Sequence, residues 1–181
     1  MQHKVYGFVG IGRMGSLMGA RLLERGHEVH VYDISADAVA ALTAKGAKAA
    51  ASPRAVGDAA DVVFLSLPNP DIVRDAALNA DGIVHCARAR RVVDFSTIGP
   101  RTAGHVADAF AARDIVYVDA PVSGGLKGAR EGTLAVMVSC AKAVYAELEE
   151  ILSLFGKPFH LGERAGQAQT MKLANNLLAA A

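Results

Sequence analysis

The stretch KVYGFVGIGRMG, residues 4–15, decides the fold of this chain. It joins a short apolar run to Gly10, Gly12 and Gly15, which have the spacing G-x-G-x-x-G, and apolar residues then recur with a helical period. A glycine turn between a strand and a helix leaves the first N–H groups of the helix free to bind phosphate. The stretch therefore predicts a strand, a phosphate-binding turn and a helix in direct succession.

The three glycines have separate uses in such a turn. Gly10 allows the tight turn, Gly12 lets a pyrophosphate approach the backbone, and Gly15 allows the helix to pack closely on the strand. Ile11, Arg13 and Met14 complete the loop, and we expect all six residues to bind a dinucleotide cofactor through its pyrophosphate. The alternative is a glycine-rich turn without a ligand, which the strand-to-helix context disfavours.

An acidic residue, Asp33, ends a second predicted strand, Glu28–Asp33, 21 residues after Gly12. At this position a carboxylate binds the hydroxyls of an adenine ribose and would repel a 2′-phosphate. The next residues, Ile34–Ala36, offer no cation to such a phosphate. The sequence therefore favours NAD over NADP, although Asp33 alone is also compatible with a strand-end turn.

Further apolar strands alternate with helices along the rest of the chain. Strands are predicted at residues 61–67, 91–96, 115–121 and 133–139, helices at 14–25, 35–45 and 141–155 and after Pro100, and a short segment at 158–161 before a last helix. This alternation is typical of a mostly parallel sheet covered on both faces. We predict an α/β, Rossmann-type doubly wound domain over residues 1–162, followed by the start of an inter-domain helix over residues 163–181.

Composition excludes several classes of function. The net charge is +1, aromatic residues make up 6% and Trp is absent, so neither nucleic acid nor anionic lipid is an expected partner. No window approaches the ~20 apolar residues of a membrane span. Cys86 and Cys140 lack metal-ligand spacing, so no metal site is expected, and we predict a cytoplasmic protein.

Two strand ends carry hydroxyl groups. In DAPVSGG, residues 119–125, the hydroxyl of Ser123 and the backbone N–H groups of Gly124 and Gly125 suit a small carboxylate. In DFSTIGP, residues 94–100, the hydroxyls belong to Ser96 and Thr97. The alternatives are an ordinary turn at the first place and a helix N-cap at the second.

The chain ends with GQAQTMKLANNLLAAA, residues 166–181. Asn175 and Asn176 lie three and four positions after Lys172, so all three share one helix face. Lys172 has few charged neighbours, and desolvation would lower its pKa towards the range of a general acid or base. The alternative is a solvated surface lysine.

Four ordered motifs together resemble the β-hydroxyacid dehydrogenases, the group that holds 3-hydroxyisobutyrate dehydrogenase and tartronate semialdehyde reductase and is related to 6-phosphogluconate dehydrogenase. They are residues 8–33, DFSTI at 94–98, residues 119–138 and MKLANN at 171–176. For the cofactor, the resemblance implies that NAD is bound by Gly10, Gly12, Gly15 and Asp33, that Leu67 and Pro68 line its cleft, and that Thr97 lies by the nicotinamide. For the substrate, it implies that the carboxylate is held by Ser123, Gly124 and Gly125. It further implies that Lys172 is the acid/base and that Asn176, with Asn175 beside it, orients the substrate.

The implied reaction is a reversible oxidation of a small 3-hydroxy acid to its semialdehyde or keto acid. The family continues into a second, all-helical domain, so we expect that domain to be missing here and homo-oligomers to form through it or through the exposed final helix. Smaller departures are Arg21, where the family often has Asn, and Ser139–Cys140, where two glycines are usual. The alternative function is a non-catalytic NAD-binding module.

Overall fold

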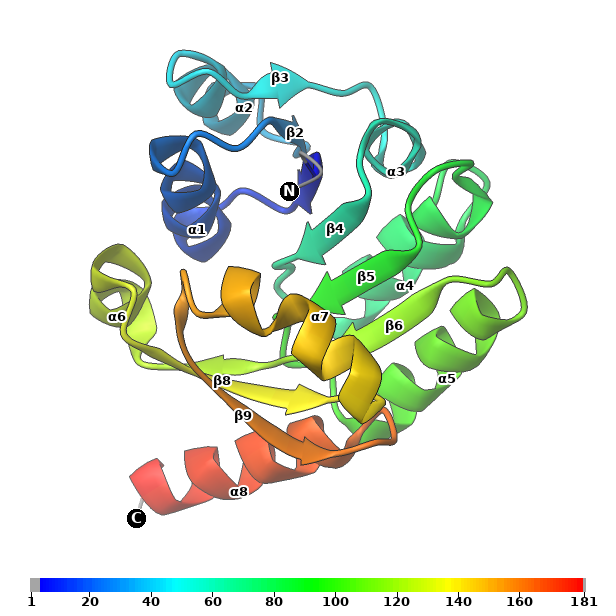
Figure 1. Cartoon of the computed structure of the whole chain (residues 1–181), viewed down its shortest axis with the longest axis vertical. Coiled ribbons are helices and arrows are strands. Elements are labelled where there is room, and N and C mark those ends of the chain that lie inside the picture. Colours follow the sequence, from blue (N-terminus) through cyan, green and yellow to red (C-terminus); the bar gives the residue numbers. More distant parts are fainter. Residues whose placement is uncertain (1–3, 181) are drawn as a thin grey trace.

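The computed structural model describes residues 4–180 and contains, within that range, one nine-stranded sheet. The strand order is β3-β2-β1-β4-β5-β6-β8-β7, and β9 pairs with β8 (Figure 1). The strands are β1 (Tyr6–Val9), β2 (Val29–Tyr32), β3 (Lys48–Ala49), β4 (Val62–Leu65), β5 (Arg91–Asp94), β6 (Val116–Asp119), β7 (Val122–Ser123), β8 (Leu134–Ser139) and β9 (Gly156–Gly162).

The strand order reverses beside β1. β1 pairs in parallel with β2 on one side and with β4 on the other, so the chain runs outwards in both directions from this strand. In open α/β sheets, ligands bind beyond the carboxyl ends of strands at such a switch point. Antiparallel pairing is confined to β8, which runs against β6 and β7. The predicted mostly parallel, doubly wound sheet is confirmed.

Helices cover both faces of this sheet, and each face has its own apolar core. Strand residues alternate between the faces, so Phe8 and Phe64 join one core while Val9 and Leu65 join the other. The first core is covered by α1 (Arg13–Glu24), α2 (Ala36–Thr43), α6 (Gly125–Glu131) and α7 (Lys142–Leu152), and the second by α3 (Pro53–Ala59), α4 (Pro70–Leu78) and α5 (Pro100–Ala111).

Three of these helices, α3, α4 and α6, have no counterpart in the sequence prediction. Two begin with a proline after a capping residue: Ser52 accepts from the N–H of Ala55, and Asn69 accepts from the N–H of Ile72. Proline suits the first turn of a helix because that turn does not use its N–H. Pro70 therefore starts α4, whereas β4 already ends at Leu65.

Arg21 joins α1 to two other segments of the chain. Its guanidinium donates to the carbonyl oxygens of Leu154, at 2.7 Å, and Arg130, at 2.9 Å. Carbonyl groups at helix ends lack partners within the helix. Arg21 thus ties α1 to the end of α6 and to the segment after α7, which gives a structural reason for arginine at this position.

The last helix, α8 (Gln167–Ala180), packs at the far end of the sheet, where it contacts α5, β6, β8 and β9 (Figure 1). Ala168 and Gln169 in its first turn are buried, whereas Leu177 is 73% and Leu178 is 78% exposed. No helix between residues 4 and 180 has the length and apolar character to cross a membrane. Oligomer formation through α8 stays a prediction.

Candidate active site

A cleft of about 670 Å³ opens beyond the carboxyl ends of β1, β2 and β4. It thus lies at the switch point of the sheet. Of the predicted cofactor residues, seven line this cleft: Gly10, Gly12, Arg13, Met14, Asp33, Leu67 and Pro68. The side chain of Ile11 is buried in the core, and Gly15 and Thr97 lie outside the described lining of the cleft.

The geometry of the glycine turn fits a pyrophosphate. Gly10 has φ +85°, which favours glycine. A Cβ on Gly15 would collide with the carbonyl oxygen of Gly10, so α1 starts directly against the turn. At Gly12, by contrast, a Cβ would meet no atom within 4 Å. The start of α1 is therefore open where a phosphate would meet its free N–H groups.

Asp33 holds the glycine turn in place. Its Oδ2 accepts from the N–H of Ile11 at 2.7 Å, and its Oδ1 accepts from the N–H of Ser35 at 2.9 Å. The bond to Ser35 forms the strand-end turn that the sequence analysis gave as the alternative role of Asp33. A carboxylate oxygen accepts more than one hydrogen bond, so both oxygens retain capacity for ribose hydroxyls. Asp33 can therefore support the turn and contact a ligand together.

The segment after β5, Ser96–Gly99, is bound to α8 through the side chain of Gln169. Its Oε1 accepts from the N–H groups of Ile98, at 2.9 Å, and Gly99, at 3.1 Å. Its Nε2 donates to the carbonyl oxygen of Ser96, at 3.0 Å, and to Oδ1 of Asp119, at 2.7 Å. The side chain is fully buried, with all of these groups satisfied.

Two buried carboxyl groups stand side by side at the ends of neighbouring strands, because Asp94 and Asp119 are paired in the register of β5 and β6. Burial raises the pKa of Asp94 to about 6, although the hydroxyl of Tyr117 donates to it at 2.8 Å. Burial also raises the pKa of Asp119. Asp119 accepts from the N–H of Gly166 at 2.8 Å, so it binds the start of α8.

Lys172 lies on α8, half-buried, and burial lowers its pKa from the ordinary lysine value of 10.5. Three residues on, Nδ2 of Asn175 donates to Oγ of Ser123 at 3.2 Å, while Asn176 is exposed. Through Asn175, Ser123 thus contacts the helix that carries Lys172, across 52 residues of sequence. Gly124 and Gly125 follow Ser123 at the start of α6, both exposed.

Sequence reasoning missed Gln169, Asp94 and Asp119. A detectable signal existed for the acids, because each ends a strongly apolar strand where water is excluded. Gln169 had no such signal, since amide residues are common on exposed helix faces. The hydroxyl of Ser96 accepts from the N–H of Leu67 at 2.9 Å, and α5 is preceded by Gly99, so the N-cap alternative at Ser96 and Thr97 is not what forms.

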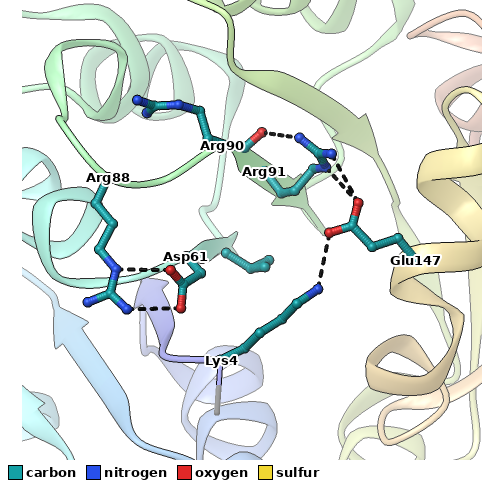
Figure 2. A pocket seen from close by; sticks show the side chains of 7 residues that line it. Lys4, Asp61, Arg88, Arg90, Arg91 and Glu147 are labelled. Atoms are coloured by element: carbon teal, nitrogen blue, oxygen red, sulfur yellow. Dashed lines mark hydrogen bonds and ion pairs between the residues drawn. The ribbon is translucent and has the colours of Figure 1, made fainter. Parts of the chain in front are cut away.

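A second, smaller depression of about 170 Å³ lies near the amino ends of β1, β4 and β5. Figure 2 shows that its acids are already paired: Asp61 with Arg88, and Glu147 with Lys4 and Arg91. These ion pairs link the segments at the amino ends of β1, β4 and β5, and Glu147 joins two of them to α7. Separately, no three His, Cys, Asp or Glu side chains within residues 4–180 form a group that could hold a metal ion.

A glycine turn at the switch point of a parallel sheet, with an acid ending the second strand, defines a dinucleotide-binding domain. Comparison with known families agrees. Residues 5–168 match the model described as the NAD binding domain of 6-phosphogluconate dehydrogenase. The chain therefore belongs to the family of this NAD-binding domain.

Similar proteins include dehydrogenases of hydroxy acids. The chain is 40% identical to 2-(hydroxymethyl)glutarate dehydrogenase of Eubacterium barkeri, over 95% of this chain and 58% of that protein. The structure of Mycobacterium tuberculosis 3-hydroxyisobutyrate dehydrogenase with L-serine superposes with a TM-score of 0.90, at 34% identity, over 99% of this chain and 61% of that one. Psf3 in complex with NADP+ and 2-OPP also superposes with a TM-score of 0.90, at 35% identity, over 96% and 62%. The chain thus spans about three fifths of the length of these relatives.

Proposed function

We propose that this chain is the cofactor-binding part of an NAD-dependent dehydrogenase that interconverts a small 3-hydroxy acid and its semialdehyde or keto acid. The observation that carries the proposal is the hydrogen bond between Asn175 on α8 and Ser123 on β7. A half-buried lysine with a lowered pKa lies on the same helix face as a residue bonded to the predicted carboxylate anchor.

Lys172 is proposed as the general acid/base. Its pKa is lowered by burial, so a larger fraction of the amine is neutral near physiological pH than in an exposed lysine. Neutral Nζ accepts the proton of the substrate hydroxyl during oxidation, and the protonated amine returns it during reduction. Bound NAD supplies the hydride acceptor in its nicotinamide ring.

The substrate carboxylate is proposed to bind at Ser123, Gly124 and Gly125. Ser123 Oγ accepts from Asn175, so its own hydroxyl proton remains available for a carboxylate. The first N–H groups of a helix have no partner within it, and α6 starts at Gly125. Anchoring one end of the substrate here would orient its hydroxyl towards α8, and positioning of this kind supplies several kcal/mol of catalysis.

NAD is proposed over NADP because of the charges in the cleft. Asp33, Asp75 and Asp81 all line it, and among its described lining residues Arg13 is the one cation. A 2′-phosphate beside Asp33 would face like charge. Titrating the chain with NADH and NADPH, and following ligand fluorescence, tests this; we expect tighter binding of NADH, and equal affinities would contradict it.

The decisive experiment measures NADH formation from NAD and a panel of 3-hydroxy acids that includes 3-hydroxyisobutyrate, L-serine and glycerate. We expect turnover of at least one acid. Replacement Lys172→Ala should abolish turnover and leave NADH affinity unchanged, because Lys172 lies outside the described lining of the cleft. Turnover that survives Lys172→Ala would refute the role of Lys172. NADH binding that is indifferent to Lys172→Ala and Ser123→Ala, with no turnover even when the expected helical domain is supplied, would instead favour a non-catalytic binding module.

A further inference from the structure

Gln169 makes four hydrogen bonds with one fully buried side chain. A buried amide is costly unless its donors and acceptors are satisfied, and a satisfied buried network is rigid. Here the bonds reach Ser96, Ile98 and Gly99 after β5 and Asp119 at the end of β6. Gln169 therefore holds the start of α8 against two strand ends at once.

The spacing along α8 gives this contact a consequence for the site. Gln169, Lys172 and Asn175 follow one another at intervals of three residues, so neighbouring members of the set share a helix face. Gln169 is bonded to the segment that carries Thr97, and Asn175 is bonded to Ser123 on β7. Lys172 lies between these two attachment points.

The two attachments differ in strength. Asn175 makes one bond of 3.2 Å to Ser123, from a helix segment whose neighbouring residues are exposed. Gln169 is buried, and the N–H groups of Gly166 and Gln169 itself also donate to Asp119, at 2.8 and 3.2 Å. The orientation of α8 is thus set mainly at its first turn, one turn before Lys172.

We propose that Gln169 is a positioning residue, which sets where Lys172 stands relative to the segment Ser96–Gly99 and to Ser123. It acts through the helix and does not touch the substrate. The catalytic consequence rests on the function proposed above, whereas the structural consequence, a displaced Lys172, can be measured without turnover.

The test compares Gln169→Met with Gln167→Met. Methionine keeps the length of glutamine and removes its hydrogen bonds. Gln167 is the matched control because its Oε1 accepts from the N–H of Arg164 at 2.9 Å, in the turn before α8. For both variants, the rate at which an amine-reactive reagent labels Lys172 is followed against pH by mass spectrometry, with NADH affinity as the control for folding.

We expect Gln169→Met to move the labelling midpoint of Lys172 upwards, towards an ordinary lysine, because a loosened helix exposes the amine. Turnover should fall about 10- to 100-fold in kcat, the effect of a displacement on the order of 1 Å, without a change in KM for NAD. Gln167→Met should match the unmodified chain. A labelling profile of Gln169→Met that coincides with that of Gln167→Met would overturn the proposal.

A second variant covers the case in which Gln169→Met fails to fold. Gln169→Glu keeps the acceptor for Ile98 and Gly99, but its ionised carboxylate has no donor for Ser96 or Asp119. This variant is tested by the same labelling midpoint of Lys172, and a midpoint equal to that of Gln167→Met would overturn the proposal. The two proposals fail in different ways. Turnover that survives Lys172→Ala removes the proposed acid/base, whereas an unmoved labelling midpoint removes the positioning role of Gln169.

Discussion

The amide of Asn175 donates to the hydroxyl of Ser123 at 3.2 Å across 52 residues of sequence. The bond joins α8 to β7, and both residues belong to the expected substrate site. It brings the predicted carboxylate anchor to the helix that carries Lys172. A substrate held at Ser123 would therefore lie against the helix that carries the proposed acid/base.

Removing this bond should lower kcat/KM for the substrate more than it affects KM for the cofactor. We expect Asn175→Ala to lower kcat/KM for the hydroxy acid about 10-fold, the effect of losing one hydrogen bond of roughly 1.4 kcal/mol. KM for NAD should stay unchanged. Steady-state kinetics of Asn175→Ala, Ser123→Ala and the double variant measure the coupling, and fully additive losses would show that the two residues act separately.

The rate of oxidation should depend on the protonation state of Lys172. Burial lowers the pKa of this lysine, and its neutral form accepts the hydroxyl proton, so kcat for oxidation should rise with pH through a value below 10.5. For reduction the protonated form is needed, so the rate should fall over the same range. Measuring kcat against pH in both directions tests this; parallel profiles would contradict it.

Arg21 should contribute to stability rather than to chemistry. Loss of its bonds to the carbonyl groups of Leu154 and Arg130 should lower the free energy of unfolding by about 1–3 kcal/mol in Arg21→Ala. Urea unfolding measures this, with Arg25→Ala, an exposed arginine beyond the same helix, as the control. Equal urea unfolding midpoints for the two variants would mean that the hydrogen bonds of Arg21 contribute nothing to stability.

Asp94 should make stability depend on pH. Its pKa in the folded chain is raised to about 6 from 3.8, so its contribution is full below the lower value and is lost as pH rises through the higher one. Asp94→Asn removes this ionisation. We expect the variant to gain about 1–3 kcal/mol relative to the unmodified chain between pH 4 and pH 8, measured by chemical unfolding. A difference in unfolding free energy between the two proteins that stays constant over this pH range would contradict a raised pKa of Asp94.

Much of the fold could be predicted because its signals are local. The glycine turn, the acid ending β2 and the alternation of apolar strands with helices each depend on neighbouring residues. The helices α3 and α4 were missed, although each has a local signal: a capping residue, Ser52 or Asn69, followed by a proline that suits the first turn of a helix. Ile11 as a cofactor residue stays a prediction, and the structure adds that its side chain enters the core and its N–H binds Asp33.

The sequence by itself determined the class of the domain, the turn that suits a pyrophosphate and the residue types available for chemistry. Only the tertiary structure decided that Gln169 is buried between two strand ends and that Asn175 reaches Ser123. Those contacts join residues separated by 50 positions or more, and no local spacing encodes them. They form because the parallel sheet gathers the carboxyl ends of its strands at one edge, where α8 packs across them.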